Sequence, residues 1–212
     1  MDKKALILLG AGGHCASCID VIEAAGEWSI EGVLDRTAGS GNVLGYSVVG
    51  SDADIENYRR KGYTFFITVG QIKFATVRES LFNLLKFNQA PVATISSPKA
   101  HVSRNSQIGV GTIVHHFASV NANAVVGDNC IINTFANIEH EVCIGNHTHI
   151  STGAIVNGGA SIGGNCFVGS GVVIAHGVSV VSNVVIGAGR LVLSDLKLAG
   201  TYVGSPCKRI NG

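Results

Sequence analysis

The chain has 212 residues, enough for one large or two modest domains. Its formal net charge of +1 argues against a nucleic-acid-binding protein, because such a protein carries a strongly basic surface. Mean hydropathy is positive, yet no apolar run reaches the length of about 18 residues that marks a membrane-spanning helix, so we expect a cytoplasmic protein without a membrane span.

Residues 1–98 alternate between apolar runs typical of buried strands and stretches with helical spacing. The predicted strands are Ala5–Leu9, Ile30–Leu34 and Thr64–Val69, and the predicted helices are Cys15–Ala25 and Val77–Phe87. This alternation predicts a small, Rossmann-like parallel sheet in an α/β domain, where ligands bind at the carboxyl ends of the strands.

The first predicted strand runs into a glycine-rich turn, Gly10-Ala11-Gly12-Gly13-His14. Glycines let a ligand approach the backbone, and the amino end of the following helix favours phosphate. The third glycine of a dinucleotide fingerprint would fall at Cys15, which does not match, although Asp35 lies at the expected distance along the chain. The turn therefore predicts a nucleotide-bearing ligand, either a dinucleotide or a nucleotide sugar. A tight turn without a ligand is the alternative.

Cys15 and Cys18 have the spacing of a redox pair or of half a zinc site. No second pair of this kind completes a zinc site in the sequence. We therefore interpret both as small residues on the buried face of the helix.

From residue 102 to residue 192, every sixth residue is Val or Ile, sixteen times in succession. Gly109, Gly127, Gly145 and Gly163 are each eighteen residues apart, which corresponds to three hexapeptides. Neither a helix nor an ordinary strand repeats at six, so the pattern predicts a solenoid whose coils are triangular turns of three short strands. We expect a parallel β-helix domain over residues 99–196, after an α/β domain over 1–98 and before a tail over 197–212.

The sequence Glu139-His140-Glu141 interrupts this repeat at a polar corner, where other hexapeptides carry Gly, Asn or Ser. A neighbouring carboxylate stabilises the charged form of an imidazole, which suits His140 to act as a general base. One coil later, Gly158 and Gly159 leave space for a substrate beside it. We interpret four other histidines as solvated corners or subunit contacts, namely His101, His115, His116 and His147.

These motifs resemble one family closely, over almost the whole chain. Asn133-Thr134 leads into Ile138-Glu139-His140-Glu141, Ile144-Gly145 and His149 follow, and the glycine turn, Asp35-Arg36, Gly70 and Val203-Gly204-Ser205-Pro206 occur in the same order. The chain resembles the bacterial hexapeptide-repeat acyltransferases of the bacillosamine N-acetyltransferase and sialic acid O-acetyltransferase type. The resemblance implies a left-handed β-helix, a homotrimer with active sites between subunits, acetyl-CoA as co-substrate and no metal.

The resemblance also implies roles for individual residues. The catalytic residues would be His140, as general base, and Glu141, which raises its basicity. The nucleotide sugar would bind through Gly12, Gly13, His14, Asp35, Arg36 and Gly70. Acetyl-CoA would be held by His149 at its acetyl end and by backbone amides near Gly158, Ser170 and Ala188. Gln71, which follows Gly70, need not match the polar residues of the family, so the sugar and the base stay open.

The expected reaction is N-acetylation of the 4-amino group of a nucleotide-linked amino sugar, bacillosamine-type and UDP-linked, for surface glycan or glycoprotein biosynthesis. One alternative is O-acetylation of sialic acid or a related sugar hydroxyl. The other is a non-catalytic or metal-binding trimeric β-helix protein.

Overall fold

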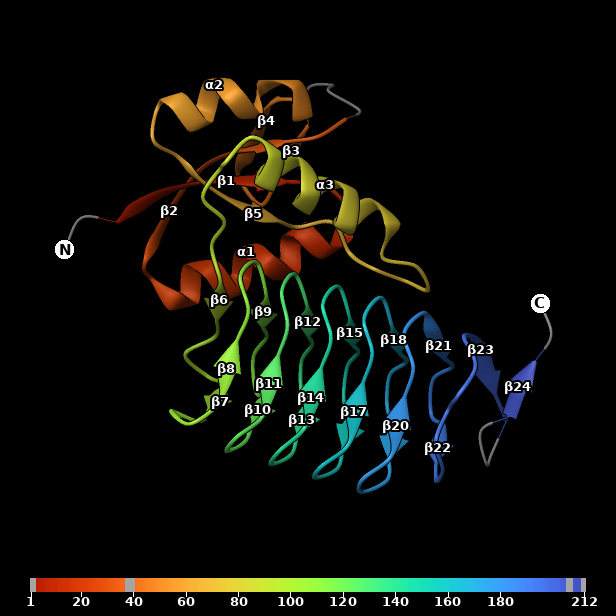
Figure 1. Ribbon diagram of the computed structural model, residues 1–212. Helices are drawn as coiled ribbons and strands as arrows, with labels where there is room; N and C mark the ends of the chain where they lie inside the picture. Colours follow the sequence, from red (N-terminus) through yellow and green to blue (C-terminus); the bar gives the residue numbers. More distant parts are fainter. Residues whose placement is uncertain (1–2, 37–40, 205–207, 211–212) are drawn as a thin grey trace.

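The computed structural model describes residues 3–36, 41–204 and 208–210. Figure 1 shows an amino-terminal α/β domain resting on one side of a β-helix. The predicted fold class, a Rossmann-like domain followed by a left-handed parallel β-helix, is confirmed. In the described part of the chain, no helix is both long enough and apolar enough to cross a membrane.

The amino-terminal domain is built on a five-stranded sheet in the order β3-β4-β2-β1-β5. Its strands are β1 (Lys4–Leu9), β2 (Trp28–Leu34), β3 (Asn42–Val43), β4 (Tyr46–Gly50) and β5 (Thr64–Ile67). Its helices are α1 (Gly13–Ala25), α2 (Ile55–Arg60) and α3 (Thr76–Phe87), with a short 3₁₀ turn at Asp52–Asp54. The central strands pair in parallel as predicted, and β3 adds an antiparallel edge that the apolar pattern did not indicate.

The β-helix consists of three sheets in which each short strand pairs with the strand one coil away. The six-stranded sheet contains β7 (His101–Val102), β10 (Ser119–Val120), β13 (Asn137–Ile138), β16 (Ile155–Val156), β19 (Val173–Ile174) and β22 (Leu191–Val192). The five-stranded sheet contains β8 (Gln107–Ile108), β11 (Val125–Val126), β14 (Cys143–Ile144), β17 (Ser161–Ile162) and β20 (Ser179–Val180). The eight-stranded sheet contains β6 (Ile95–Ser96), β9 (Ile113–Val114), β12 (Ile131–Ile132), β15 (His149–Ile150), β18 (Phe167–Val168), β21 (Val184–Ile186), β23 (Gly200–Val203) and β24 (Lys208–Ile210).

The hexapeptide pattern sets both the interior and the corners of the prism. All the repeating Val and Ile residues are buried except the first two, which are partly buried. Every sixth residue from Gly111 to Gly189 has a positive φ, which turns the chain at a corner. Most of these residues are Gly or Asn, which adopt this conformation most readily. Glu141 is one of four exceptions, with a φ of 61°.

The β-helix extends at both ends beyond the sixfold repeat. Strand β6 already pairs with β9, so the solenoid sheet begins before residue 99. At the other end, β23 pairs in parallel with β21, and β24 adds an antiparallel strand to β23. Of the tail motif around Gly204, residues Ser205, Pro206 and Cys207 lie outside the described residues.

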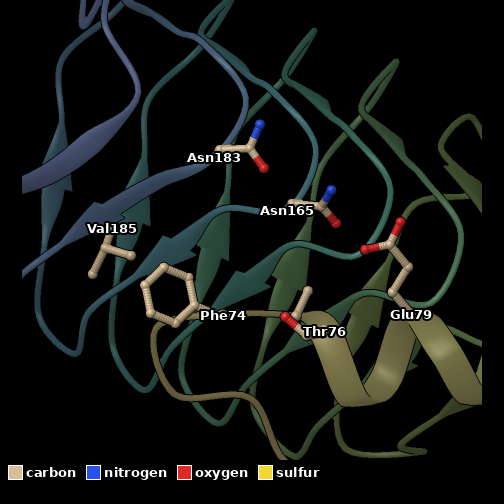
Figure 2. Close-up of a pocket in the computed structure, with 7 residues that line it drawn as sticks. Phe74, Thr76, Glu79, Asn165, Asn183 and Val185 are labelled. Atoms are coloured by element: carbon tan, nitrogen blue, oxygen red, sulfur yellow. The ribbon is translucent and has the colours of Figure 1, made fainter.

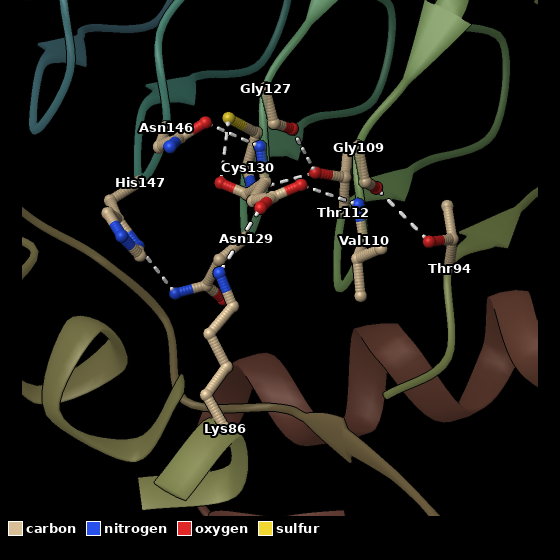
Figure 3. Close-up of polar contacts among 11 residues, drawn as sticks. Lys86, Thr94, Gly109, Val110, Thr112, Gly127, Asn129, Cys130, Asn146 and His147 are labelled. Carbon is tan, nitrogen blue, oxygen red and sulfur yellow. Dashed lines mark hydrogen bonds and ion pairs between the residues drawn. The ribbon is translucent and has the colours of Figure 1, made fainter. Parts of the chain in front are cut away.

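The two domains pack together through the eight-stranded sheet. The outward side chains of Ile113 and Ile131 join the core formed by α1 and β1. Figure 3 shows a second attachment, at a corner beside α3, where the Asn129 side-chain amide donates to His147 Nδ1 at 2.9 Å. The same amide group donates to the backbone oxygen of Arg78 on α3 at 3.2 Å, and its oxygen accepts from the Arg78 guanidinium at 2.8 Å. These contacts fix the amino-terminal domain on one face of the prism.

Candidate active site

A pocket of about 710 Å³ lies where the carboxyl ends of β1, β2 and β5 meet the β-helix. We call it the glycine-turn pocket, and it is lined by Gly10, Gly12, Gly13, His14, Asp35, Val69, Gly70, Gln71, Ile72 and His149. It therefore brings together five of the six residues predicted to bind the nucleotide sugar. The sixth, Arg36, is exposed and does not line it.

The backbone of the glycine turn is fixed at one end and open at the other. Gly10 has a φ of 106°, and a Cβ there would lie 2.4 Å from a methyl group of Val69, so only glycine fits. The N–H of Ala11 donates to the Asp35 carboxylate at 2.7 Å. By contrast, a Cβ at Gly12 or Gly13 would meet nothing within 4 Å.

Helix α1 presents a bare amino end to this open space. Gly12 is its N-cap residue and makes no side-chain capping bond, and the first turn contains no acidic residue. The first N–H groups of a helix lack partners within the helix and carry a partial positive charge. The turn therefore offers backbone donors and a favourable field to an anionic group such as a phosphate.

Three histidines lie where the two domains meet, namely the partly buried His14 and the buried His115 and His149, and we call them the junction histidines. Burial is the main cause that lowers the pKa of His14 to about 3, with neighbouring positive groups on His115 and Arg78 adding to it. Burial likewise lowers the pKa values of His115 and His149 to about 4. All three imidazoles are therefore neutral near pH 7. The interpretation of His115 as a solvated corner or subunit contact is wrong, because only 1% of its surface is exposed and its ring faces His14 on α1 of its own chain.

His149 connects the β-helix to the loop that closes the glycine-turn pocket. Its Nδ1–H donates to the backbone oxygen of Gln71 at 2.7 Å, because a carbonyl oxygen can only accept. Its Nε2 therefore accepts from the Asn133 amide at 3.1 Å. This places His149 among the residues around the predicted sugar site, whereas the family resemblance assigned it to the acetyl end of acetyl-CoA.

Gln71 lines the pocket and is 2% exposed. Its side-chain nitrogen donates to the backbone oxygen of Cys166 at 3.1 Å, which fixes the orientation of the amide. Its Oε1 is buried and has no partner among the described residues. Only a weak sign of this role is visible in the sequence, namely a polar residue directly after a buried strand and Gly70.

His140 and Glu141 occupy the corner between β13 and β14. His140 Nδ1 lies 3.3 Å from Glu141 Oε2, and both side chains are more than half exposed. The imidazole packs on Gly158, where a Cβ would lie 2.6 Å from both Cε1 and Nε2. The space that the sequence predicted at Gly158 is therefore the space that the His140 ring itself uses.

Glu139 is turned toward amide groups rather than toward the imidazole. Its carboxylate accepts from Asn137 at 2.8 Å and from Asn121 at 3.2 Å. The carboxylate that lies beside the imidazole at this corner is therefore that of Glu141.

The His140 corner and the glycine-turn pocket lie on opposite sides of the β-helix. The corner joins the six-stranded and five-stranded sheets, whereas the pocket borders the eight-stranded sheet through β15. In a triangular prism, the corner between two faces is opposite the third face, and Figure 1 shows the β13–β14 turn at the lower edge and the amino-terminal domain above. One chain therefore does not bring His140 to the pocket.

The other positions implied for acetyl-CoA are also divided between corners. Gly158 lies against His140. His176 lies one coil beyond Gly158, and its Cε1 atom is 3.8 Å from the position of a Cβ at Gly159. A hollow of about 500 Å³ borders His176 and Lys197. Ser170 and Ala188 follow β18 and β21 at a different corner, so a single chain does not group them with Gly158.

Figure 2 shows a third, small cavity beside the start of α3. It has a volume of about 80 Å³ and is lined by Phe74, Ala75, Thr76, Glu79, Asn165, Asn183 and Val185. Ligand pockets for small molecules commonly have volumes of about 300 to 1,000 Å³. The glycine-turn pocket has the size for a nucleotide sugar, and this cavity does not.

Residues 5–85 match the family model described as the PglD N-terminal domain. This range contains the glycine turn, Asp35 and Gly70, and it ends within α3. No curated protein sequence matches the chain.

Solved structures match the chain over nearly its whole length. The acetyltransferase domain of PglB from Neisseria gonorrhoeae FA1090 is 28% identical, with a TM-score of 0.91 over 98% of this chain and 100% of that chain. The same domain was also solved in complex with acetyl coenzyme A, at 27% identity, a TM-score of 0.92 and coverage of 99% and 100%. PerB from Caulobacter crescentus, in complex with CoA and GDP-perosamine, is 28% identical, with a TM-score of 0.91 over 98% of this chain and 97% of that chain. WeeI from Acinetobacter baumannii AYE shares the fold at 19% identity, with a TM-score of 0.74 over 98% and 100%.

Proposed function

We propose that this chain, which belongs to the hexapeptide-repeat sugar N-acetyltransferases, transfers the acetyl group of acetyl-CoA to the amino group of a nucleotide-linked amino sugar. The observation that carries the proposal is the near-complete structural match to a sugar N-acetyltransferase solved with both CoA and GDP-perosamine. More specifically, we propose a 4-amino sugar of the bacillosamine type, UDP-linked, acetylated in the cytoplasm for surface glycan or glycoprotein biosynthesis.

The glycine-turn pocket supports a nucleotide sugar as the ligand. Its volume of about 710 Å³ suits a ligand of this size. Gly12 and Gly13 border open space at the bare amino end of α1, where a pyrophosphate would accept backbone hydrogen bonds. Asp35, at the end of β2, lies where the acidic residue of a Rossmann-like domain contacts the ribose.

The His140–Glu141 pair supports direct attack by the sugar amine. A Glu141 carboxylate that accepts from His140 Nδ1–H leaves the lone pair of Nε2 available. The amine nitrogen forms a bond to the thioester carbonyl carbon while Nε2 takes a proton from that nitrogen. The carbon–sulfur bond then breaks, the electron pair leaves with the sulfur of CoA, and the proton on His140 passes to this thiolate. No covalent acetyl-enzyme is needed.

The separation of His140 from the pocket of its own chain supports an active site shared between subunits. Acetyl-CoA and the sugar amine must meet at the base, and the amino-terminal domain of one chain lies on the far side of its own prism from His140. In a homotrimer, the pocket of one subunit would face the His140 corner of the next. This arrangement would also bring the Ser170 and Ala188 corner of one subunit near Gly158 of its neighbour.

Replacement of the base tests the mechanism. We expect His140→Ala to lower kcat by roughly 10² to 10⁴-fold, the usual worth of general-base catalysis, and to leave the KM for acetyl-CoA nearly unchanged. His101→Ala is the matched control, because His101 is an exposed solenoid histidine on β7, the edge strand of the sheet that contains β13. Release of the CoA thiol with a 4-amino nucleotide sugar gives the rates. Turnover that survives His140→Ala intact would exclude His140 as the base.

The acceptor is tested by binding. A thermal-shift series with UDP-, GDP- and dTDP-linked amino sugars, each with and without CoA, identifies the ligand, because binding to the native state raises Tm. We expect the largest shift with a UDP-linked amino sugar. If free sialic acid shifts Tm and the nucleotide sugars do not, the acceptor is a sugar hydroxyl and the reaction is O-acetylation.

A further inference from the structure

We propose that His14, Cys18 and His115 form a zinc site where the amino-terminal domain meets the β-helix. One ligand atom from each residue can be chosen so that all three lie within 4.8 Å of one another. Among the described residues, no other group of three or more His, Cys, Asp or Glu side chains meets this condition.

Both domains contribute to this group. His14 and Cys18 are four residues apart on α1, so their side chains project from the same face of the helix. His115 follows β9 in the eight-stranded sheet and faces that helix, with its ring centre 5.4 Å from the ring centre of His14. The sequence showed only half of a zinc site in Cys15 and Cys18, and the fold places two histidines beside the second cysteine.

Two of the three residues are buried, and each histidine has one buried ring nitrogen without a partner among the described residues. His115 is 1% exposed and Cys18 is 0% exposed. The Nε2 atoms of His14 and His115 are both buried without a hydrogen-bond partner among the described residues. Buried polar atoms are nearly always paired, because an unpaired one loses its hydration without compensation. A metal ion would satisfy both nitrogens at once.

Metal binding at this site requires the thiolate form of Cys18. Binding would replace the thiol proton: the sulfur–hydrogen bond breaks, a sulfur–zinc bond forms, and the proton goes to solvent.

Zinc is the ion that this ligand set favours. It accepts a mixture of imidazole nitrogen and thiolate sulfur, and three protein ligands leave a fourth position open. Ligand atoms at zinc distances lie roughly 3.4 Å apart, so atoms that lie within 4.8 Å of one another must close by at most about 1.4 Å. Arg78 is fully buried nearby and its charge opposes a dication, but the new thiolate offsets one unit of charge. We therefore expect weaker binding than at an all-cysteine site.

Cobalt titration of the full chain tests the site without any use of acetyl transfer. Cys143 is exposed and Cys207 lies outside the described residues, so both are first replaced by serine to remove competing thiols. In protein stripped with a chelator, we expect one equivalent of Co²⁺ to produce a thiolate-to-cobalt charge-transfer band that Zn²⁺ abolishes. Zn²⁺ should also raise Tm.

The two cysteines of α1 provide a matched pair of variants, because both are completely buried. Cys18→Ser should remove the charge-transfer band and the Zn²⁺-dependent rise in Tm, and Cys15→Ser should keep both. If Cys18→Ser does not fold, as judged by circular dichroism, His115→Asn takes its place and should weaken Co²⁺ binding at least tenfold. The proposal is overturned if the parent protein gives no charge-transfer band, if the band persists in Cys18→Ser, or if His115→Asn binds Co²⁺ as tightly as the parent.

Discussion

Gly158→Ala should displace the His140 imidazole without disturbing the β-helix. The new methyl group would lie 2.6 Å from both Cε1 and Nε2 of His140, whereas ordinary contact begins at 3.4 Å. The ring must therefore move by about 0.8 Å. It can do so because the His140 side chain is 56% exposed. The backbone accepts alanine, since Ala122 occupies the same corner position two coils earlier.

The displacement should be costly for catalysis and nearly neutral for folding. A misplacement of about 1 Å in a catalytic group can cost roughly 10²-fold in rate, which corresponds to about 2.7 kcal/mol of transition-state stabilisation. Replacement of glycine by alanine at a compatible backbone position stabilises a fold by about 0.4 to 1 kcal/mol. We therefore expect kcat to fall roughly 10²-fold in Gly158→Ala, while Tm stays within a few degrees of the parent value.

A double-mutant cycle decides whether the effect passes through His140. The rates of Gly158→Ala, His140→Ala and the double variant are measured by release of the CoA thiol. If the methyl group acts only by moving the imidazole, it has nothing left to displace in the His140→Ala background, and its effect on kcat disappears there. A Gly158→Ala enzyme with parental kcat, or an effect of equal size in both backgrounds, would refute this reasoning.

Three further predictions concern the pocket, the junction and the core. Gln71→Leu removes the unpartnered buried acceptor of the pocket. The Kd of the nucleotide sugar should therefore rise roughly 10-fold in calorimetry, while the Kd of acetyl-CoA stays constant. Equal affinities of the variant and the parent for the sugar would contradict this role. The pKa values of the junction histidines are about 3 to 4 in the folded protein, against a reference value of 6.5. The folded state therefore binds fewer protons than the unfolded state between these values. The contribution of the histidines to stability is complete above pH 6.5 and is lost as the pH falls toward 4. Urea unfolding of chelator-stripped protein should therefore show a loss of roughly 2 kcal/mol per histidine between pH 7 and pH 5, and identical curves would count against neutral histidines. Ile132→Ala, in the completely buried solenoid core, should lower the free energy of unfolding by about 2 to 5 kcal/mol in the same assay.

The sixfold repeat made the β-helix predictable from the sequence, because the repeat acts locally in every coil. Each repeating Val or Ile contributes to the interior, and Gly or Asn supplies most of the corners with positive φ. The same regularity exposed Glu139-His140-Glu141 as an irregular corner. The added strand β6 escaped prediction because Ile95–Ser96 lies before the repeat and is recruited by pairing with β9, a tertiary effect.

The glycine turn was equally predictable from the sequence, since each of its features is local to one strand–helix connection. Gly10 needs its positive φ, and Gly12 caps α1 without a side chain. The contact that His149 makes could not be predicted in this way. Its hexapeptide has the same residue pattern as the neighbouring hexapeptides. Only the docking of the 71–75 loop onto β15 brings its Nδ1 to the backbone of Gln71.

The two halves of the candidate site are positioned by different features of the chain. This difference explains why the sequence predicted both halves but not their relative position. The His140 corner depends on a period of six residues, which fixes its place around the prism. The glycine-turn pocket depends on where the amino-terminal domain docks, and that is set by the outward apolar residues Ile113 and Ile131 of the eight-stranded sheet. No sequence period relates the docking face to the His140 corner. Because the docked face is the one opposite His140, the proposed sugar pocket and the proposed base lie apart within one chain, and this separation favours an active site that a second copy completes.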